Sequence, residues 1–175
     1  ILAKKNEGRL TGWLAYTLSK SEQQTPGRTP NESGINNGKW YDTNYDKTHD
    51  ISFTTTYDYN KKWDFSANFA FQTGLPVNYP TGQYNFNGIN VPVYGDRNSN
   101  RLPAYHRLDI SATYIPKPNK QNGLQSSWNF GIYNVYNRKN ANSISFREND
   151  DTGRNEAAKL SLFGIIPSVT YNFKF

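Results

Sequence analysis

The sequence predicts an all-β fold, an antiparallel sheet of the up-and-down type, from three observations. Apolar and polar residues alternate along most of the chain, the connections alternate between short and long, and the last segment is amphipathic and ends on Phe175. Alternation with a period of two indicates strands with one apolar face. No window carries the periodicity of an amphipathic helix, so we expect strands throughout.

We expect six strands in this chain, preceded by the tail of a seventh at residues 1–5. In the clearest example Ile51, Phe53, Tyr57 and Tyr59 occupy one face, with small polar side chains between them. The expected strands lie near residues 9–20, 48–59, 63–73, 106–115, 124–138 and 163–175. Because side chains of a strand point alternately to the two faces, each of these segments predicts one apolar and one polar face.

The connections differ in length in a regular way. Residues 60–62 and 116–123 are short and rich in turn formers, whereas the connections 21–47, 74–105 and 139–162 each exceed 20 residues. Because long and short connections alternate, all long loops emerge at one end of the sheet. Transmembrane β-barrels of the outer membrane have this asymmetry, with short periplasmic turns and longer extracellular loops.

The composition of the two faces also favours a transmembrane β-barrel. The polar face carries Ser, Thr, Asn and Asp, whereas all five glutamates fall in predicted turns or loops. Small polar side chains suit the wall of a wide lumen, and bulky aromatic residues without Lys or Glu suit a lipid-facing surface. Strands of about 10 residues, tilted near 45°, span the hydrocarbon layer. A soluble β-sandwich, with the same rings as its core, stays open as an alternative.

Several aromatic residues gather toward the end with the short turns, where rings at the level of the lipid headgroups would form a girdle. The predicted girdle consists of Tyr57, Tyr59, Trp63, Tyr114, Trp128 and Tyr171. The last strand is apolar at every second residue back from Phe175, which resembles the C-terminal signature that the barrel assembly machinery of bacteria reads. We therefore expect Tyr171, Phe173 and Phe175 to form an assembly signal.

Four ordered segments carry a family resemblance: residues 45–51, 101–109, 133–140 and the end of the chain from Leu160. They resemble the C-terminal barrel of TonB-dependent outer-membrane transporters of the Bacteroidetes type. The resemblance spans essentially the whole chain. It implies a barrel of about 22 strands, an N-terminal plug and a TonB box. Neither plug nor box is present here, so residues 1–175 are expected to be the C-terminal part of a longer barrel.

The resemblance also implies a function and partners. It implies active import of a scarce ligand, such as a siderophore, a metal complex or a glycan, across the bacterial outer membrane. The implied partners are outer-membrane lipid, the barrel assembly machinery and the TonB complex, reached through the absent N-terminal part. A surface lipoprotein is left open, because the branch that binds one tends to end differently. A passive porin-like or adhesive barrel is the main alternative.

The residues predict neither an enzyme nor a metal or cofactor site. No nucleophile, zinc or phosphate-loop motif is present, and the chain has no cysteine. His49 and His106 fall on strands separated by a third, which places them roughly 10 Å apart. The segment 96–101 imitates half a calcium loop but lacks its Gly and Glu. The net charge of +6 is scattered, so we expect no nucleic-acid partner.

The long loops are the better place for ligand contact. They carry aromatic rings among Asn and Gly, a mixture that suits polar ligands too large for a simple pore. The candidate ligand-binding residues are Trp40, Tyr41, Tyr45, Tyr79, Tyr84 and Tyr94. The alternative, that these rings only pack the loops against each other, stays open because aromatic rings dominate such packing as well.

Overall fold

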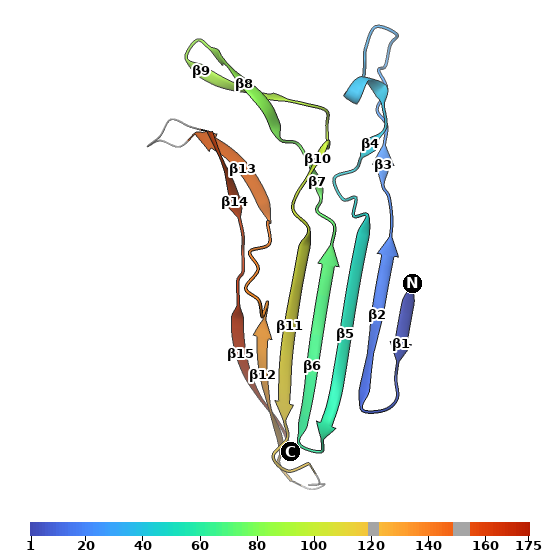
Figure 1. The fold of residues 1–175 in the computed structure, drawn as a ribbon, viewed down its shortest axis with the longest axis vertical. Coiled ribbons are helices and arrows are strands. Elements are labelled where there is room, and N and C mark those ends of the chain that lie inside the picture. The colour runs from blue at the N-terminus through green and yellow to red at the C-terminus, as the bar shows by residue number, and fades with distance from the viewer. Residues whose placement is uncertain (119–122, 149–154) are drawn as a thin grey trace.

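A computed structural model describes residues 1–118, 123–148 and 155–175. Its main element is a seven-stranded antiparallel sheet in which the strands follow their order in the chain (Figure 1). The strands are β1 (Leu2–Lys5), β2 (Leu10–Leu18), β5 (His49–Asn60), β6 (Trp63–Gln72), β11 (Tyr105–Tyr114), β12 (Gln125–Tyr133) and β15 (Ile166–Lys174). The predicted all-β, antiparallel, up-and-down fold is confirmed. The sheet is open, with β1 and β15 as its edges, and the described residues form no closed barrel.

The long connections lie together at one end of the sheet and the short turns at the other, as predicted (Figure 1). They are not structureless, because each contains paired strands. These are β3 (Glu22–Gln23) with β4 (Tyr41–Asp42), β7 (Pro76–Val77) with β10 (Asn100–Arg101), β8 (Pro80–Phe86) with β9 (Ile89–Tyr94), and β13 (Ser143–Glu148) with β14 (Asn155–Leu160). The 3₁₀ turn η1 (Ile35–Gly38) lies in the first. Residues 119–122 of the predicted turn 116–123 and 149–154 of the predicted loop 139–162 lie outside the described residues.

The pairing register places the predicted apolar residues on one continuous face. Phe53 lies opposite Phe69, and Ile51 lies opposite Phe71. On the other face Thr54 lies opposite Asn68, and the Thr54 hydroxyl donates to Asn68 Oδ1 at 2.8 Å. Cross-strand pairs of this kind stabilise a sheet on each face separately. The predicted division into an apolar and a polar face is therefore present across the sheet.

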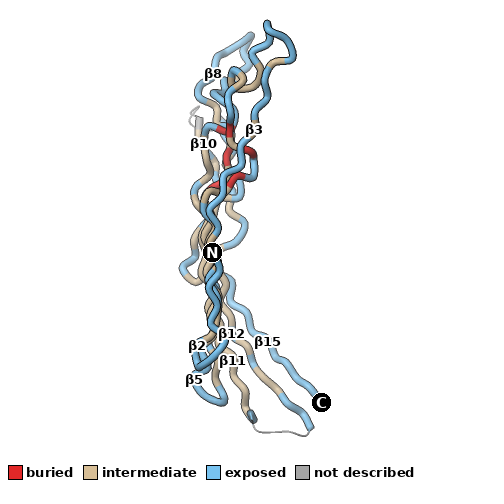
Figure 2. The backbone as a smooth tube through the Cα atoms, turned by 90° about the vertical axis from the view of Figure 1, so that its right-hand side faces the viewer, coloured by how far each residue is buried: buried red, intermediate tan, exposed pale blue. Residues whose placement is uncertain are grey.

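The sheet has no apolar core. In the described part of the chain the buried apolar side chains are Tyr41 and Pro76, and both lie in the long connections rather than in the sheet. Phe53, Phe65 and Phe130 on the apolar face stay 39%, 43% and 43% exposed. Seen edge-on, the sheet is one layer thick, and the buried backbone visible in this view lies above it (Figure 2). A β-sandwich would need a second sheet about 10 Å away, and the residues described here form none.

Two strand boundaries differ from the predicted ones by more than two residues. Strand β12 ends at Tyr133 rather than near residue 138, because Asn134 and Asn137 adopt left-handed conformations with φ of 54° and 55°. The buried Asn134 side chain closes this turn, since it bonds both the N–H and the C=O of Arg138. Strand β15 begins at Ile166 rather than near residue 163. No helix among the described residues is long and apolar enough to cross a membrane.

Candidate functional site

An ion cluster joins the first two long connections just above the sheet. Asp46 is almost fully buried, and its Oδ1 accepts a hydrogen bond from the Ser21 N–H at 2.6 Å. The guanidinium of Arg101 forms ion pairs with both Asp42 and Asp46. Its Nη1 also donates to the carbonyl oxygens of Gly74, at 3.1 Å, and Asp46, at 3.3 Å. One arginine thus ties together residues far apart in the sequence.

The charges of this cluster stabilise each other. Burial opposes the charged form of Asp46, but the hydrogen bonds from Arg101 and Ser21 outweigh it, so the pKa of this carboxyl lies below its ordinary value. Burial likewise opposes the charge of Arg101, and its hydrogen bonds with Asp46 and Asp42 raise its pKa all the same. Both groups are therefore ionised at neutral pH, and the pair is a permanent ionic contact.

Two asparagines extend the contact between the same connections. The buried Asn98 side chain donates to the Asp42 carbonyl at 2.7 Å and to Asn44 Oδ1 at 2.8 Å. The Asn36 side chain forms two hydrogen bonds with the backbone of Arg97: it accepts from the Arg97 N–H at 2.7 Å and donates to the Arg97 carbonyl at 3.0 Å. From the sequence, the segment 96–101 is considered only as a calcium loop. In the structure, residues of this segment contact the first long connection and so hold the two connections together. No group of three or more His, Asp or Glu that could hold a metal occurs among the residues described.

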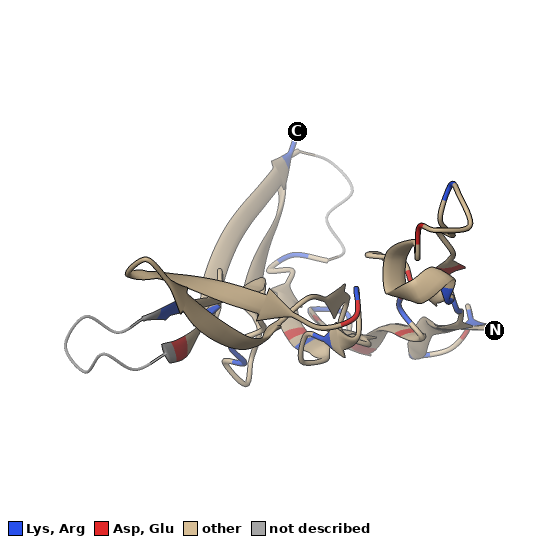
Figure 3. Ribbon diagram, turned by 90° about the horizontal axis from the view of Figure 1, so that it is seen from above, with Lys and Arg blue, Asp and Glu red and all other residues tan. Residues whose placement is uncertain are grey.

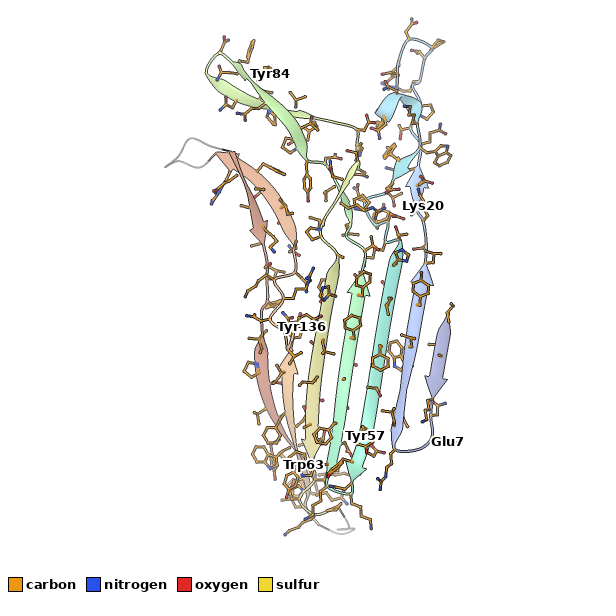
Figure 4. All side chains as sticks on the ribbon, viewed as in Figure 1. Glu7, Lys20, Tyr57, Trp63, Tyr84 and Tyr136 are labelled. Carbon is orange, nitrogen blue, oxygen red and sulfur yellow. The ribbon has the colours of Figure 1, made fainter. Side chains whose placement is uncertain are left out.

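Four of the six predicted ligand-binding aromatics are exposed in the loops. Trp40 and Tyr45 are 64% and 78% exposed in the first connection, and Tyr84 and Tyr94 are 54% and 56% exposed in the second. Tyr84 lies on the β8–β9 hairpin, which projects beyond the sheet (Figure 4). These four rings are accessible to a ligand.

The other two predicted rings pack against the loops. The hydroxyl of Tyr41 is 3.0 Å from the Thr25 hydroxyl, and its ring is buried. Tyr79 meets Phe146 of β13 edge-to-face, with ring centroids 5.2 Å apart. The Tyr79 hydroxyl is buried without a partner in the described residues, and burial raises its pKa. For these two residues the packing alternative describes the observed contacts.

The predicted girdle residues lie side by side near the short turns. Trp63, Tyr114, Trp128 and Tyr171 are directly opposite one another across four strands. Their rings pair at 4.8 Å (Trp63 with Tyr114) and 4.7 Å (Trp128 with Tyr171). Figure 4 shows Tyr57 and Trp63 at this end of the sheet. These side chains form what we call the lower aromatic row.

The lower aromatic row continues at both ends. The rings of Tyr57 and Tyr59 lie 6.4 Å apart on β5. At the other end Phe173 lies 5.9 Å from Tyr171 and 5.6 Å from Phe175. The three residues of the predicted assembly signal therefore form one continuous aromatic run at the edge strand.

A second row, not anticipated from the sequence, lies near the opposite end of the same face. Tyr16, Phe71 and His106 occupy one level of the register on β2, β6 and β11. The Tyr136 hydroxyl bonds Nδ1 of His106 at 2.8 Å and stands just beyond β12 (Figure 4). We call these four side chains the upper aromatic row. His49, two residues beyond this level on β5, bonds the Tyr16 hydroxyl through Nδ1 at 3.0 Å.

The charged residues at the loop end are of both signs (Figure 3). On the polar face one of them, Arg107, contacts Tyr105, Tyr133 and Asp109. Sequence reasoning did not select this cluster, because these residues are brought together only by strand pairing. No protein-family model, curated protein or solved structure matches this chain. The function is therefore argued from its surfaces.

Proposed function

We propose that this chain is part of the wall of an outer-membrane β-barrel whose apolar face contacts lipid. The observation that carries the proposal is the pair of aromatic rows on one face. Phe71 and Trp63 are eight residues apart on β6, which is about 27 Å along the strand. A tilt of roughly 35–45° reduces this to about 20 Å along the membrane normal, close to the apolar band of roughly 25 Å in such barrels.

The surface between the two rows has the chemistry of a lipid-facing wall. Strands β2, β5, β6, β11, β12 and β15, which are fully described, carry no charged side chain on this face between the rows. Lys5 on the edge strand β1 is on the same face. An apolar surface of this extent is not typical of a soluble monomer. Transfer of each large side chain from water into hydrocarbon is favourable by about 1.5–3 kcal/mol.

The free edges of the sheet require further strands in this proposal. Backbone groups at the edges β1 and β15 would each cost several kcal/mol if left unpaired in lipid. The resemblance to TonB-dependent transporters implies these further strands, because such transporters have a barrel of about 22 strands. The polar face, with pairs such as Thr54 and Asn68, would then line the lumen.

Ligand import is the function that we infer for the whole barrel. The exposed rings of Trp40, Tyr45, Tyr84 and Tyr94 stand beyond the upper aromatic row, where the extracellular loops of a barrel lie. The ion cluster of Arg101 holds two of these loops in one arrangement. A preorganised loop surface lowers the entropic cost of binding. The TonB complex, the barrel assembly machinery and any surface lipoprotein are partners within this proposal.

The membrane face can be tested residue by residue, because the chain has no cysteine. Single cysteines at Phe69 and Asn68, labelled with an environment-sensitive fluorophore, should report opposite surroundings in vesicles. We expect quenching by a lipid-borne nitroxide at Phe69→Cys and by aqueous iodide at Asn68→Cys. The same response at both positions would contradict the proposed sidedness. Uptake that persists without TonB would instead favour the passive barrel.

A further inference from the structure

Arg107 is held on the polar face by three side chains. Its Nη1 donates to the hydroxyl of Tyr133 at 2.7 Å and to that of Tyr105 at 3.1 Å. Its Nη2 lies 3.0 Å from Asp109 Oδ2. The centre of the guanidinium is 4.1 Å from the centroid of the Tyr133 ring. Because these contacts come from three directions, the orientation of the guanidinium is fixed by the protein itself.

In the part of the chain that the structure describes, some hydrogen-bond donors of Arg107 and of the two tyrosines have no acceptor. An arginine has five N–H groups, and the contacts above leave the Nε–H of Arg107 without a partner among the described residues. Both tyrosine oxygens accept from Arg107, so each hydroxyl proton is free to be donated. Tyr105 and Tyr133 also interact with each other, which uses one of these two protons at most. A site with surplus donors is complementary to a group that only accepts.

A small cavity of about 210 Å³ adjoins these tyrosines. Tyr105, Tyr133 and Phe163 line it, together with Leu162 and Asn142. Phe163 meets Tyr133 edge-to-face at 6.4 Å. Asn134 and Asn140 also border the cavity, but their side-chain amides donate to backbone carbonyls. These two amides are therefore structural parts of the cavity wall. The cavity accommodates one small ring rather than an entire large ligand.

The charges around the cavity favour an anion. Apart from Tyr105, its lining residues lie in the segments 133–142 and 162–163, which contain Arg138 and Lys139 and no Asp or Glu. Arg138 reaches the cavity wall, since its Nε donates to Asn140 Oδ1 at 3.1 Å. Asp109 neutralises part of the charge of Arg107. A positive field of this moderate size attracts single negative charges.

We propose that the Tyr105–Tyr133 cavity binds a carboxylate group borne on a small ring of the ligand. The carboxylate is an acceptor with two oxygens, and it matches the hydroxyl donors of Tyr105 and Tyr133, which line the cavity and are both bonded by Arg107. Beside Arg107 the neighbouring side chains at the same level of the polar face, Ala70 and Ser52, are short. The approach along the polar face is therefore open. This inference names a ligand chemistry for the proposed transporter and rests on that function.

The test uses the whole protein in detergent micelles and ¹⁹F NMR of 4-fluorobenzoate. We expect 4-fluorobenzoate to bind, and the neutral 4-fluorobenzamide and the dianionic 4-fluorophenylphosphonate to bind less tightly. Arg107→Gln should weaken benzoate binding at least roughly tenfold, the loss expected for hydrogen bonds to a charged group. Arg97→Gln, in the second long connection, is the matched control and should leave the affinity unchanged.

A second, more conservative variant distinguishes a loss of binding from a loss of folding. The double variant Tyr105→Phe, Tyr133→Phe removes only two hydroxyls and keeps the rings, and it should also weaken benzoate binding. Equal affinity for benzoate and benzamide, tighter binding of the phosphonate, or unchanged affinity in this double variant would overturn the proposal. Membrane insertion is followed separately by heat-modifiable migration on gels. An inserted protein that does not bind benzoate contradicts this inference alone, whereas failure of the parent protein to insert contradicts the proposed function.

Discussion

Trp63 and Tyr114 are paired directly across β6 and β11, with ring centroids 4.8 Å apart and an interplanar angle of 35°. The same arrangement recurs two strands further on, where Trp128 and Tyr171 lie 4.7 Å apart at 46°. Such tilted pairs contribute about 0.5–1.5 kcal/mol beyond the area that they bury. The lower aromatic row thus contains two such ring pairs at one level of the register, and in the proposed membrane setting they anchor four strands at that level.

The proposed lipid face predicts a difference between adjacent residues of β6. Phe69→Arg places a charge between the two aromatic rows and should lower the free energy of unfolding in lipid vesicles by about 2–4 kcal/mol. Asn68→Arg, the matched control on the polar face, should have a far smaller effect. Urea titration of the refolded protein measures both. Equal losses at the two positions would be incompatible with the assignment of the faces.

The ion cluster predicts that Arg101 keeps the two loops together. Arg101→Ala leaves Asp46 buried without its cationic partner, which should cost on the order of 3–5 kcal/mol. We expect the loss to appear as local opening of the connections 21–47 and 74–105 while the sheet stays folded. Hydrogen exchange of the Ser21 N–H measures it. Arg97→Ala is the control, and comparable exchange in both variants would contradict the central role of Arg101.

The lowered pKa of Asp46 predicts a specific pH dependence. Because the pKa of this carboxyl in the folded protein lies below its ordinary value of 3.8, its stabilising effect is complete above that value. The effect is lost as the pH falls through the folded pKa. Limited proteolysis of the loops should therefore stay constant from neutral pH to about pH 5 and increase only under stronger acid. In Asp46→Asn this acid step should be absent, and its persistence would assign the step to another group.

The exposed loop rings predict a separation of binding from folding. Tyr84→Ala should reduce ligand uptake while the protein keeps its heat-resistant migration on gels, because the ring is 54% exposed and supports no core. Tyr41→Ala should instead disturb the loop, since this ring is buried. Tyr94→Ala provides a second exposed position. Loss of folding in the Tyr84 variant would favour the packing alternative for this ring as well.

Within the proposed barrel, the aromatic run on β15 predicts an effect on assembly rather than on transport. Deleting Phe175 removes the last ring of the run Tyr171, Phe173 and Phe175. The amount of protein assembled in the outer membrane should fall, with unfolded chain left in the periplasm, whereas uptake per assembled molecule should barely change. Quantitative blotting of membrane fractions measures this. Assembly at the normal level would contradict the proposal that this strand carries an assembly signal, but it would not contradict the barrel proposal.

Sequence alone determined the strands of the main sheet and the residues that share each face. The alternation of Ile51, Phe53 and Tyr57 is a local property, because the direction of a side chain in a strand depends only on its position along the backbone. The lower aromatic row could be anticipated for the same reason. Its members stand near the ends of neighbouring strands, so antiparallel order alone brings them to one level.

The tertiary structure decided what depends on register and on the paths of the long connections. The upper aromatic row needs Tyr16, Phe71 and His106 at one level, which follows from the cross-strand pairing and not from any one segment. Asp42 and Arg101 are 59 residues apart, and Arg107 and Tyr133 are 26 apart. No local pattern encodes such pairs, because they form only after the strands between them have paired and the loops have closed. Arg107, Tyr105 and Tyr133, which the proposed carboxylate site uses, belong to that second group.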